Sequence, residues 1–179
     1  DTNTVYLDTS VTATEGTDYT DGNGVINNII ISAGSTTGTV NFTPTDDSIY
    51  EGDETAIISI NTVAGKAVEN STPQEVTITI TENESAPTVS LSSSASSITE
   101  NSGSNITLTA TLSGATDSAI TVALGTSGTA TEGTDYSDDG GTSSLDDITI
   151  SAGATTGTVT FNPTTDTVCE INNETATIS

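Results

Sequence analysis

The chain contains a long internal repeat, and this repeat sets the size of the unit that must fold. The segment ATEGTDY occurs at residues 13–19 and again at residues 130–136, an offset of 117 residues. The segment ISAGSTTGTVNFTPT at residues 31–45 returns as ISAGATTGTVTFNPT at residues 150–164, an offset of 119 residues. Two long matches in the same order indicate duplication of a module of about 120 residues, which is the size of a domain and not of a solenoid repeat.

The 179 residues hold about one and a half such modules, so we expect neither copy to be whole. Residues 1–86 correspond to the later part of the module and are expected to lack its first strands. Residues 87–179 correspond to the earlier part and are expected to lack its last strand. The sequence therefore predicts two partial domains with unpaired strand edges.

Apolar residues alternate with threonine through much of both copies. EVTITITE at residues 75–82 and NITLTATLSG at residues 105–114 show the period of two that is typical of strands with one buried face. Threonine favours strands, and no segment has the pattern of a helix of any length. Seven short strands per full module, separated by Gly, Asn, Ser and Asp turns, predict an all-β, antiparallel, immunoglobulin-like β-sandwich with Greek-key connections. The strands are expected near residues 3–8, 28–32, 38–43, 54–61 and 75–82, and near 88–92, 105–113, 119–124, 147–151, 156–161 and from 174.

The charge of the chain excludes several classes of partner. Twenty-five acidic residues stand against one basic residue, Lys66, which gives a formal net charge of −24. Such a surface repels the phosphates of nucleic acids and of anionic membranes. No apolar run approaches the roughly 20 residues of a membrane span, so direct membrane insertion is not expected.

Acidic residues that are far apart in the sequence are expected to meet at one end of each sandwich. Consecutive antiparallel strands place alternate loops at the same end. That end then receives the cluster DDSIYEGDE at residues 46–54 and a series of further acids: Glu15, Asp18, Asp21, Glu82, Glu84, Glu100, Glu132, Asp135, Asp138 and Asp139. Two carboxylates about 5 Å apart repel by roughly 3 kcal/mol at an effective dielectric constant near 20, so the group needs a counter-charge.

A bound divalent cation is the counter-charge that these ligands favour. Ca²⁺ takes six to eight oxygen ligands, whereas Mg²⁺ keeps its waters and rarely occupies an all-protein cage. Zinc is disfavoured because the chain has no His and a single Cys, Cys169, which we expect to be a small, partly buried apolar side chain. The stretch DGNGV at residues 21–25 is rejected as an EF-hand loop because Val25 occupies a ligand position.

Simple solvation is the alternative explanation for acidic side chains on loops. We accept it for five acids that stand apart from the predicted convergence: Asp1, Asp8, Glu69, Glu75 and Asp117. We favour ion binding for the cluster at residues 46–54 because acids from four loops are expected to converge there.

Several motifs together resemble the Calx-β domain. They are GTATEGTDY at residues 128–136, ITISAGATTGTVTF at 148–161, DDSIYEGDE at 46–54, VTITITEN at 76–83 and SITENSG at 97–103. The resemblance covers essentially the whole chain as two partial copies. It implies a calcium-binding β-sandwich of the kind found in sodium–calcium exchangers, integrin β4 and long bacterial surface proteins.

The resemblance also implies which residues would bind calcium. In the first copy they are Asp18, Asp46, Asp47, the main-chain carbonyl of Ile49, Glu51, Glu54, Glu82 and Glu84. In the second copy they are Glu100, Asp135, Asp166, Glu170 and Glu174. The second copy departs from the pattern, because Thr165 replaces an acid and EINNET replaces EGDET. We therefore expect the second copy to bind fewer ions, or to bind them more weakly.

These features favour a calcium-rigidified stalk module of a secreted or cell-surface protein. Its partners would be neighbouring repeats of the same chain, and cell-surface proteins or glycans. Two alternatives stay open, namely a passive acidic spacer and a carbohydrate- or ice-binding adhesin that uses threonine rows such as Thr77, Thr79 and Thr81. A regulatory calcium sensor within an ion exchanger is a further alternative. An enzyme is not expected, because the chain has no His and its single Cys and Lys have no evident catalytic partners.

Overall fold

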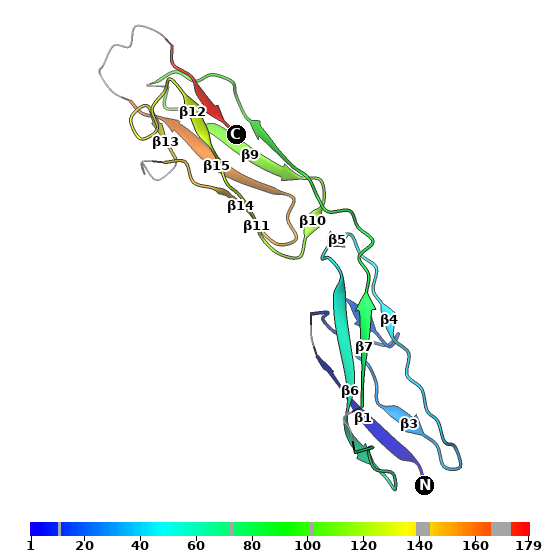
Figure 1. The fold of residues 1–179 in the computed structure, drawn as a ribbon. Coiled ribbons are helices and arrows are strands. Elements are labelled where there is room, and N and C mark those ends of the chain that lie inside the picture. The colour runs from blue at the N-terminus through cyan, green and yellow to red at the C-terminus, as the bar shows by residue number, and fades with distance from the viewer. Residues whose placement is uncertain (11, 72–73, 101, 139–143, 166–172) are drawn as a thin grey trace. The chain divides into compact units, whose positions relative to one another are not determined.

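A computed structural model describes residues 1–10, 12–71, 74–100, 102–138, 144–165 and 173–179. The chain forms two compact units, Asp1–Glu84 and Ser85–Ser179, and the described residues contain strands and no helix (Figure 1). This confirms the all-β, antiparallel sandwich predicted from the period-two alternation. No helix among the described residues is long and apolar enough to cross a membrane.

The first unit is built on a four-stranded antiparallel sheet in the order β3-β1-β6-β7. In this sheet Glu54, the first residue of β6, pairs with Ile80, the last residue of β7. Residues that follow β7 therefore lie beside residues that precede β6. The strands of this unit are β1 (Asn3–Ser10), β2 (Tyr19–Thr20), β3 (Ile29–Ile31), β4 (Thr43–Pro44), β5 (Ile49–Tyr50), β6 (Glu54–Ala64) and β7 (Glu75–Ile80).

The strand expected at residues 38–43 is largely wrong. Only β4, at Thr43–Pro44, is a strand in this region, and it pairs with the short β2. The repeated sequence in the second unit does form a long strand, β15 (Thr156–Pro163), because β9 (Ile106–Leu112) runs antiparallel beside it. No described strand of the first unit pairs with residues 38–42, so their backbone groups have no ladder to join.

The second unit places a four-stranded sheet, β13-β15-β9-β8, against two strand pairs, β11–β14 and β12–β16. The strand expected near residues 119–124 is shorter than expected. It is β11, which pairs with β14. A second strand, β12, follows Gly125 and pairs with β16. The remaining strands are β8 (Val89–Ser93), β10 (Ala115–Thr116), β11 (Ile120–Val122), β12 (Thr126–Gly128), β13 (Tyr136–Ser137), β14 (Ile148–Ile150) and β16 (Ala176–Ile178).

The core of each unit follows from the same sequence patterns. In the second unit alternate residues of β9, from Ile106 to Leu112, are buried against Ile148 and Ile150 of β14. A Leu or Ile side chain contributes roughly 1.5–3 kcal/mol when it is fully buried. A stacked aromatic pair recurs in both units at a centroid distance of 4.6 Å, between Tyr19 and Phe42 and between Tyr136 and Phe161. The tyrosine of each pair is the last residue of the repeated turn TEGTDY, which carries a predicted site residue, Asp18 or Asp135.

Candidate metal centre

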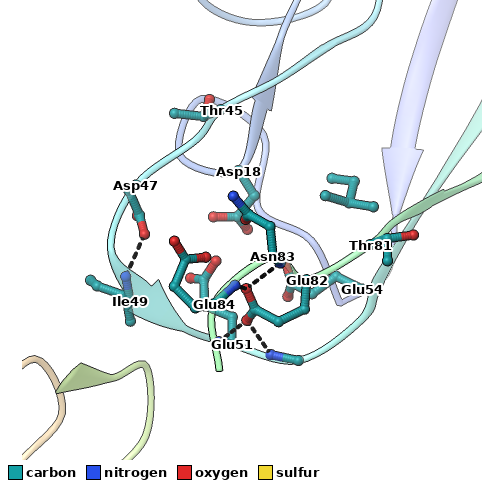
Figure 2. A pocket seen from close by; sticks show the side chains of 12 residues that line it. Asp18, Thr45, Asp47, Ile49, Glu51, Glu54, Thr81, Glu82, Asn83 and Glu84 are labelled. Atoms are coloured by element: carbon teal, nitrogen blue, oxygen red, sulfur yellow. Dashed lines mark hydrogen bonds between the residues drawn. The ribbon is translucent and has the colours of Figure 1, made fainter. Parts of the chain in front are cut away.

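The first unit contains a small acidic cavity at the end of the sheet where β7 stops and β6 starts (Figure 2). Its volume is about 30 Å³, which is enough for a water molecule or a small ion. Three segments far apart in the sequence contribute to it: the turn before β2, the stretch around β5, and the residues after β7. The lining residues are Asp18, Thr45, Asp47, Ile49, Glu51, Gly52, Glu54, Ile80, Thr81, Glu82, Asn83 and Glu84.

Three carboxylates form the centre of this site. One oxygen from each of Asp18, Glu51 and Glu54 lies within 4.8 Å of the other two. Asp18 is only 8% exposed, so burial adds to the cost of its negative charge. Three carboxylates at this separation repel one another unless a positive charge lies between them.

The backbone fixes the position of Asp18. The N–H of Thr14 donates to Asp18 Oδ2 at 2.5 Å, and the N–H of Thr45 donates to the Asp18 carbonyl at 2.8 Å. The turn that makes this possible needs a left-handed residue, which Gly16 supplies at φ +86°. These bonds therefore hold the Asp18 carboxylate at the cavity.

No basic side chain of the protein balances this charge. Lys66 is the single basic residue of the sequence, and its Nζ lies 2.5 Å from Asp1 Oδ2 in an exposed ion pair. No partner for Lys66 was evident from the sequence, and the structure provides one. No basic side chain of the protein is therefore available as a counter-charge for the acidic centre.

Glu82 organises the loops around the site (Figure 2). Its Oε2 accepts hydrogen bonds from the N–H groups of Glu51 at 2.5 Å and Gly52 at 2.8 Å. Its Oε1 accepts hydrogen bonds from the N–H groups of Asn83 and Glu84, both at 2.9 Å. The bonds from Glu84, Glu51 and Gly52 lower the pKa of Glu82 to about 2, because they stabilise the carboxylate.

Glu84 has the opposite electrostatic environment. A side-chain hydrogen bond with Glu82 and burial raise the pKa of Glu84, and the charges of Glu82 and Asp46 raise it further. A raised pKa in a carboxyl group surrounded by other carboxyl groups indicates that negative charge is in excess at this end of the unit. An added cation would relieve that excess.

The structure brings most of the sequence-predicted residues of the first copy together. Asp18, Asp47, Ile49, Glu51, Glu54, Glu82 and Glu84 all line the cavity. Asp46 is not among the lining residues, but its Oδ1 accepts a hydrogen bond at 2.8 Å from Asn83 Nδ2. Asp47 Oδ1 accepts one from the N–H of Ile49 at 2.7 Å, which closes the turn before β5.

Sequence reasoning missed two residues that shape this site. Asn83 joins the end of the first unit to Asp46, and Asp53 Oδ1 accepts the N–H of Glu82 at 2.9 Å. Asp53 lies within the acidic cluster at residues 46–54, and Asn83 ends the motif VTITITEN. The register of β6 against β7, which the sequence does not show, is what brings Asp53 to residue 82.

The second unit has a related but less complete cluster. Burial is the main cause that raises the pKa of Glu174, followed by a hydrogen bond with Asp135 and the charges of Asp135 and Glu100. Asp135 occupies the same turn as Asp18, with its Oδ2 accepting the N–H of Thr131 at 2.6 Å. The other two predicted residues, Asp166 and Glu170, lie outside the described residues, as does Cys169.

Two acids that were expected at the acidic end serve the framework of the sandwich instead. Glu15 accepts hydrogen bonds from the N–H of Ile26 and from Thr9 Oγ1. Its repeat, Glu132, accepts the equivalent bonds from Leu145 at 2.5 Å and from Thr126 Oγ1 at 3.1 Å. Neither residue lines the acidic cavity of the first unit.

The chemistry of the donors fits a hard cation. The cavity of the first unit offers carboxylate oxygens, and Ile49 in its lining offers a main-chain carbonyl. Its lining includes neither a thiolate nor an imidazole, which softer metals prefer.

Comparison with known proteins agrees with the two-unit architecture. A family model described as the Calx-beta domain matches the chain twice, over residues 2–84 and over residues 82–179. No curated protein and no solved structure matches the chain significantly.

Proposed function

The chain belongs to the Calx-beta domain family, and from this premise we propose that its first unit binds a calcium ion between Asp18, Glu51 and Glu54. The observation that carries the proposal is the convergence of three carboxylate oxygens within 4.8 Å of one another in a chain with one basic residue. The ion would supply the positive charge that this group of carboxylates needs. Calx-beta domains are associated with calcium binding, which supports the choice of metal.

The surrounding residues would have two different roles. Asp47, Glu84 and the carbonyl of Ile49, from residues that line the cavity, would complete the oxygen ligands around the ion, together with Asp46. Glu82 is better suited to positioning the loops than to direct coordination, because each of its oxygens already accepts two backbone N–H groups. Its four bonds connect the turn before β6 to the segment after β7, and both segments line the cavity.

The second unit would hold calcium more weakly. Its proposed ligands are Glu100, Asp135 and Glu174, which influence one another electrostatically, together with Asp166 and Glu170. The loss of acids between residues 165 and 175, relative to the first copy, supports a lower affinity.

At the level of the protein, we propose a non-catalytic structural module of a calcium-dependent stalk. Calx-beta domains are structural domains that occur in extracellular or membrane-associated parts of proteins, which supports a secreted or cell-surface location. Neighbouring repeats, and cell-surface proteins or glycans, would be its partners. Glu82, Asn83 and Glu84 line the cavity and are also the last residues of the first unit. An ion bound there would therefore order the segment through which the chain leaves that unit.

Small-angle X-ray scattering of the 179-residue chain tests this stiffening. We expect the range of maximum molecular dimensions that fits the scattering to be narrower in millimolar calcium than in chelator. The variant Glu51→Gln should not respond to calcium, whereas the control Glu75→Gln, at the opposite end of β7, should respond like the unmodified chain. Equal distributions with calcium and with chelator would remove the stalk proposal while leaving calcium binding itself to be tested by titration.

A further inference from the structure

One side-chain pair, which lies next to β3 in the first unit and next to β14 in the second, differs between the two units. In the first unit Asn27 Nδ2 donates a hydrogen bond to Asp21 Oδ2, and the N–H of Asn23 donates to Asp21 Oδ1 at 2.8 Å. These bonds lower the pKa of Asp21, with the Asn27 side chain as the largest cause. The pair joins Asp21, the residue after β2, to the segment before β3. Its donor is an amide N–H, so the hydrogen bond forms with Asp21 ionised.

The surrounding framework is the same in the second unit, so the equivalent residues can be identified. Ile26 N–H donates to Glu15, as Leu145 N–H donates to Glu132. The next contact also repeats: the N–H of Leu7 in β1 donates to Asn28 Oδ1 at 3.2 Å in the first unit, and the N–H of Leu124, between β11 and β12, donates to Asp147 Oδ1 at 3.3 Å in the second. The position of Asn27 is therefore taken by Asp146, and that of Asp21 by Asp138.

This exchange of an amide for a carboxyl group changes the chemistry of the pair. The repeat sets Asp146 against Asp138 as it sets Asn27 against Asp21, and the interaction with the Asp138 side chain is the largest cause that raises the pKa of Asp146. Two ionised carboxylates have no proton to donate, so a hydrogen bond between these two side chains needs one of them to be protonated. Asp138 is 4% exposed, and burial disfavours two adjacent negative charges.

The neighbouring charges all favour the protonated form. The bond to Asp138 and the charge of Asp138 raise the pKa of Asp146, burial adds to this, and Asp147 repels it further. Glu132, another acid, holds the adjacent Leu145 N–H. Asp139 follows in the sequence but lies outside the described residues. The only basic side chain of the protein, Lys66, is paired with Asp1 in the first unit.

We propose that Asp138 and Asp146 share one proton, and that this acid-stabilised pair ties the end of β13 to the start of β14 more strongly at low pH than at high pH. The direction follows from linkage. An acid that is easier to protonate in the folded state than in the unfolded chain stabilises the fold at low pH, and this contribution is lost as the pH rises through the folded pKa. The equivalent tie in the first unit uses an amide and keeps its strength over the same range.

Reciprocal substitutions in the whole chain test the proposal. Asp146→Asn reproduces the first unit's amide pair, and Asn27→Asp creates a carboxyl pair in the first unit. The control Asp147→Asn removes a neighbouring charge and keeps an oxygen for its backbone partner. The readouts are the ¹³C shifts of the carboxyl groups and the exchange of β14 amides, corrected for intrinsic rates, between pH 4 and 8 in chelator.

We expect a carboxyl titration clearly above the ordinary aspartate range, together with β14 amides whose protection falls as the pH rises. In Asp146→Asn this pH dependence should disappear, in Asn27→Asp it should appear at β3, and in Asp147→Asn it should persist. Titration of both Asp138 and Asp146 in the ordinary range would overturn the proposal. So would protection of β14 that depends on added calcium and not on pH, since a cation would then bridge the pair.

Discussion

At the scale of single residues, the same side-chain type has several distinct roles in this protein. Glu82 accepts four backbone hydrogen bonds, Glu15 connects a hydroxyl group to a backbone N–H, and Asp18, Glu51 and Glu54 bring carboxylate oxygens to one point. The sequence predicted that these acids belong at one end of the sandwich, because strand alternation decides which loops are neighbours. It could not separate loop-positioning acids from acids that face the cavity, because that depends on which backbone N–H groups lie within hydrogen-bonding distance.

The role assigned to Glu82 predicts a specific acid sensitivity. Its pKa is about 2 against an ordinary value of 4.5, so its contribution is fully present above pH 4.5 and is lost as the pH falls towards 2. In Glu82→Gln the amides of Glu51 and Gly52 should exchange on the order of tenfold faster at neutral pH, even in chelator, because bonds to a charged acceptor are the stronger ones.

Hydrogen exchange at these two amides measures the effect directly. Glu84→Gln is the control, because Glu84 accepts none of the bonds from Glu51 and Gly52 that reach Glu82. Unchanged exchange in Glu82→Gln would show that these loops do not depend on that carboxylate.

At the scale of strands, alternation predicted the elements well and their partners incompletely. The segments near residues 106–112 and 75–80 are strands as expected. The nearly identical segments at 37–44 and 156–163 differ in outcome, because only the second has a long strand beside it. Local sequence gives the preference for extended structure, whereas ladder hydrogen bonds require a neighbour that the pattern itself does not identify.

The close approach of β14 and β15 gives a prediction at this scale. A Cβ atom on Gly157 would lie 2.4 Å from the carbonyl oxygen of Thr149, which is backbone and cannot move aside easily. Gly157→Ala should therefore lower the free energy of unfolding of the second unit by about 1–3 kcal/mol. Gly114→Ala is a matched control, because a Cβ there meets nothing within 4 Å.

Urea unfolding of both variants, followed by a probe in the second unit, checks this prediction. A Gly157→Ala variant as stable as Gly114→Ala would mean that β14 and β15 are not packed as closely as described.

At the scale of the whole molecule, the duplication repeats a framework and varies its charged sites. Both units keep the aromatic pair and the turn that holds Asp18 or Asp135. Both also keep a glutamate, Glu15 or Glu132, that accepts a backbone N–H from the segment before β3 or β14. Their sequences differ in the acids of residues 46–54 and 165–174, and Asp146 replaces Asn27. The repeat in the sequence was enough to predict the shared framework, but the contact between Asp138 and Asp146 required the structure, because the two residues are eight positions apart.

Calcium should therefore stabilise the two units unequally. With about 10 mM calcium and a dissociation constant near 100 µM, binding would stabilise the first unit by roughly 2.7 kcal/mol. We expect differential scanning calorimetry to show one transition that rises clearly with calcium and a second that rises less. Two transitions that shift equally would contradict the difference that we infer between the sites.

Isothermal calorimetric titration of the whole chain with calcium tests the central claim most directly. The account predicts saturable binding that is at least about tenfold weaker in Glu51→Gln, since losing a charged ligand costs on the order of 1.4 kcal/mol or more. Binding should be unchanged in Glu75→Gln, whose side chain lies away from the cavity. Absence of binding at millimolar calcium, or equal binding by the unmodified chain and Glu51→Gln, would contradict the claim that the converging carboxylates of the first unit hold a calcium ion.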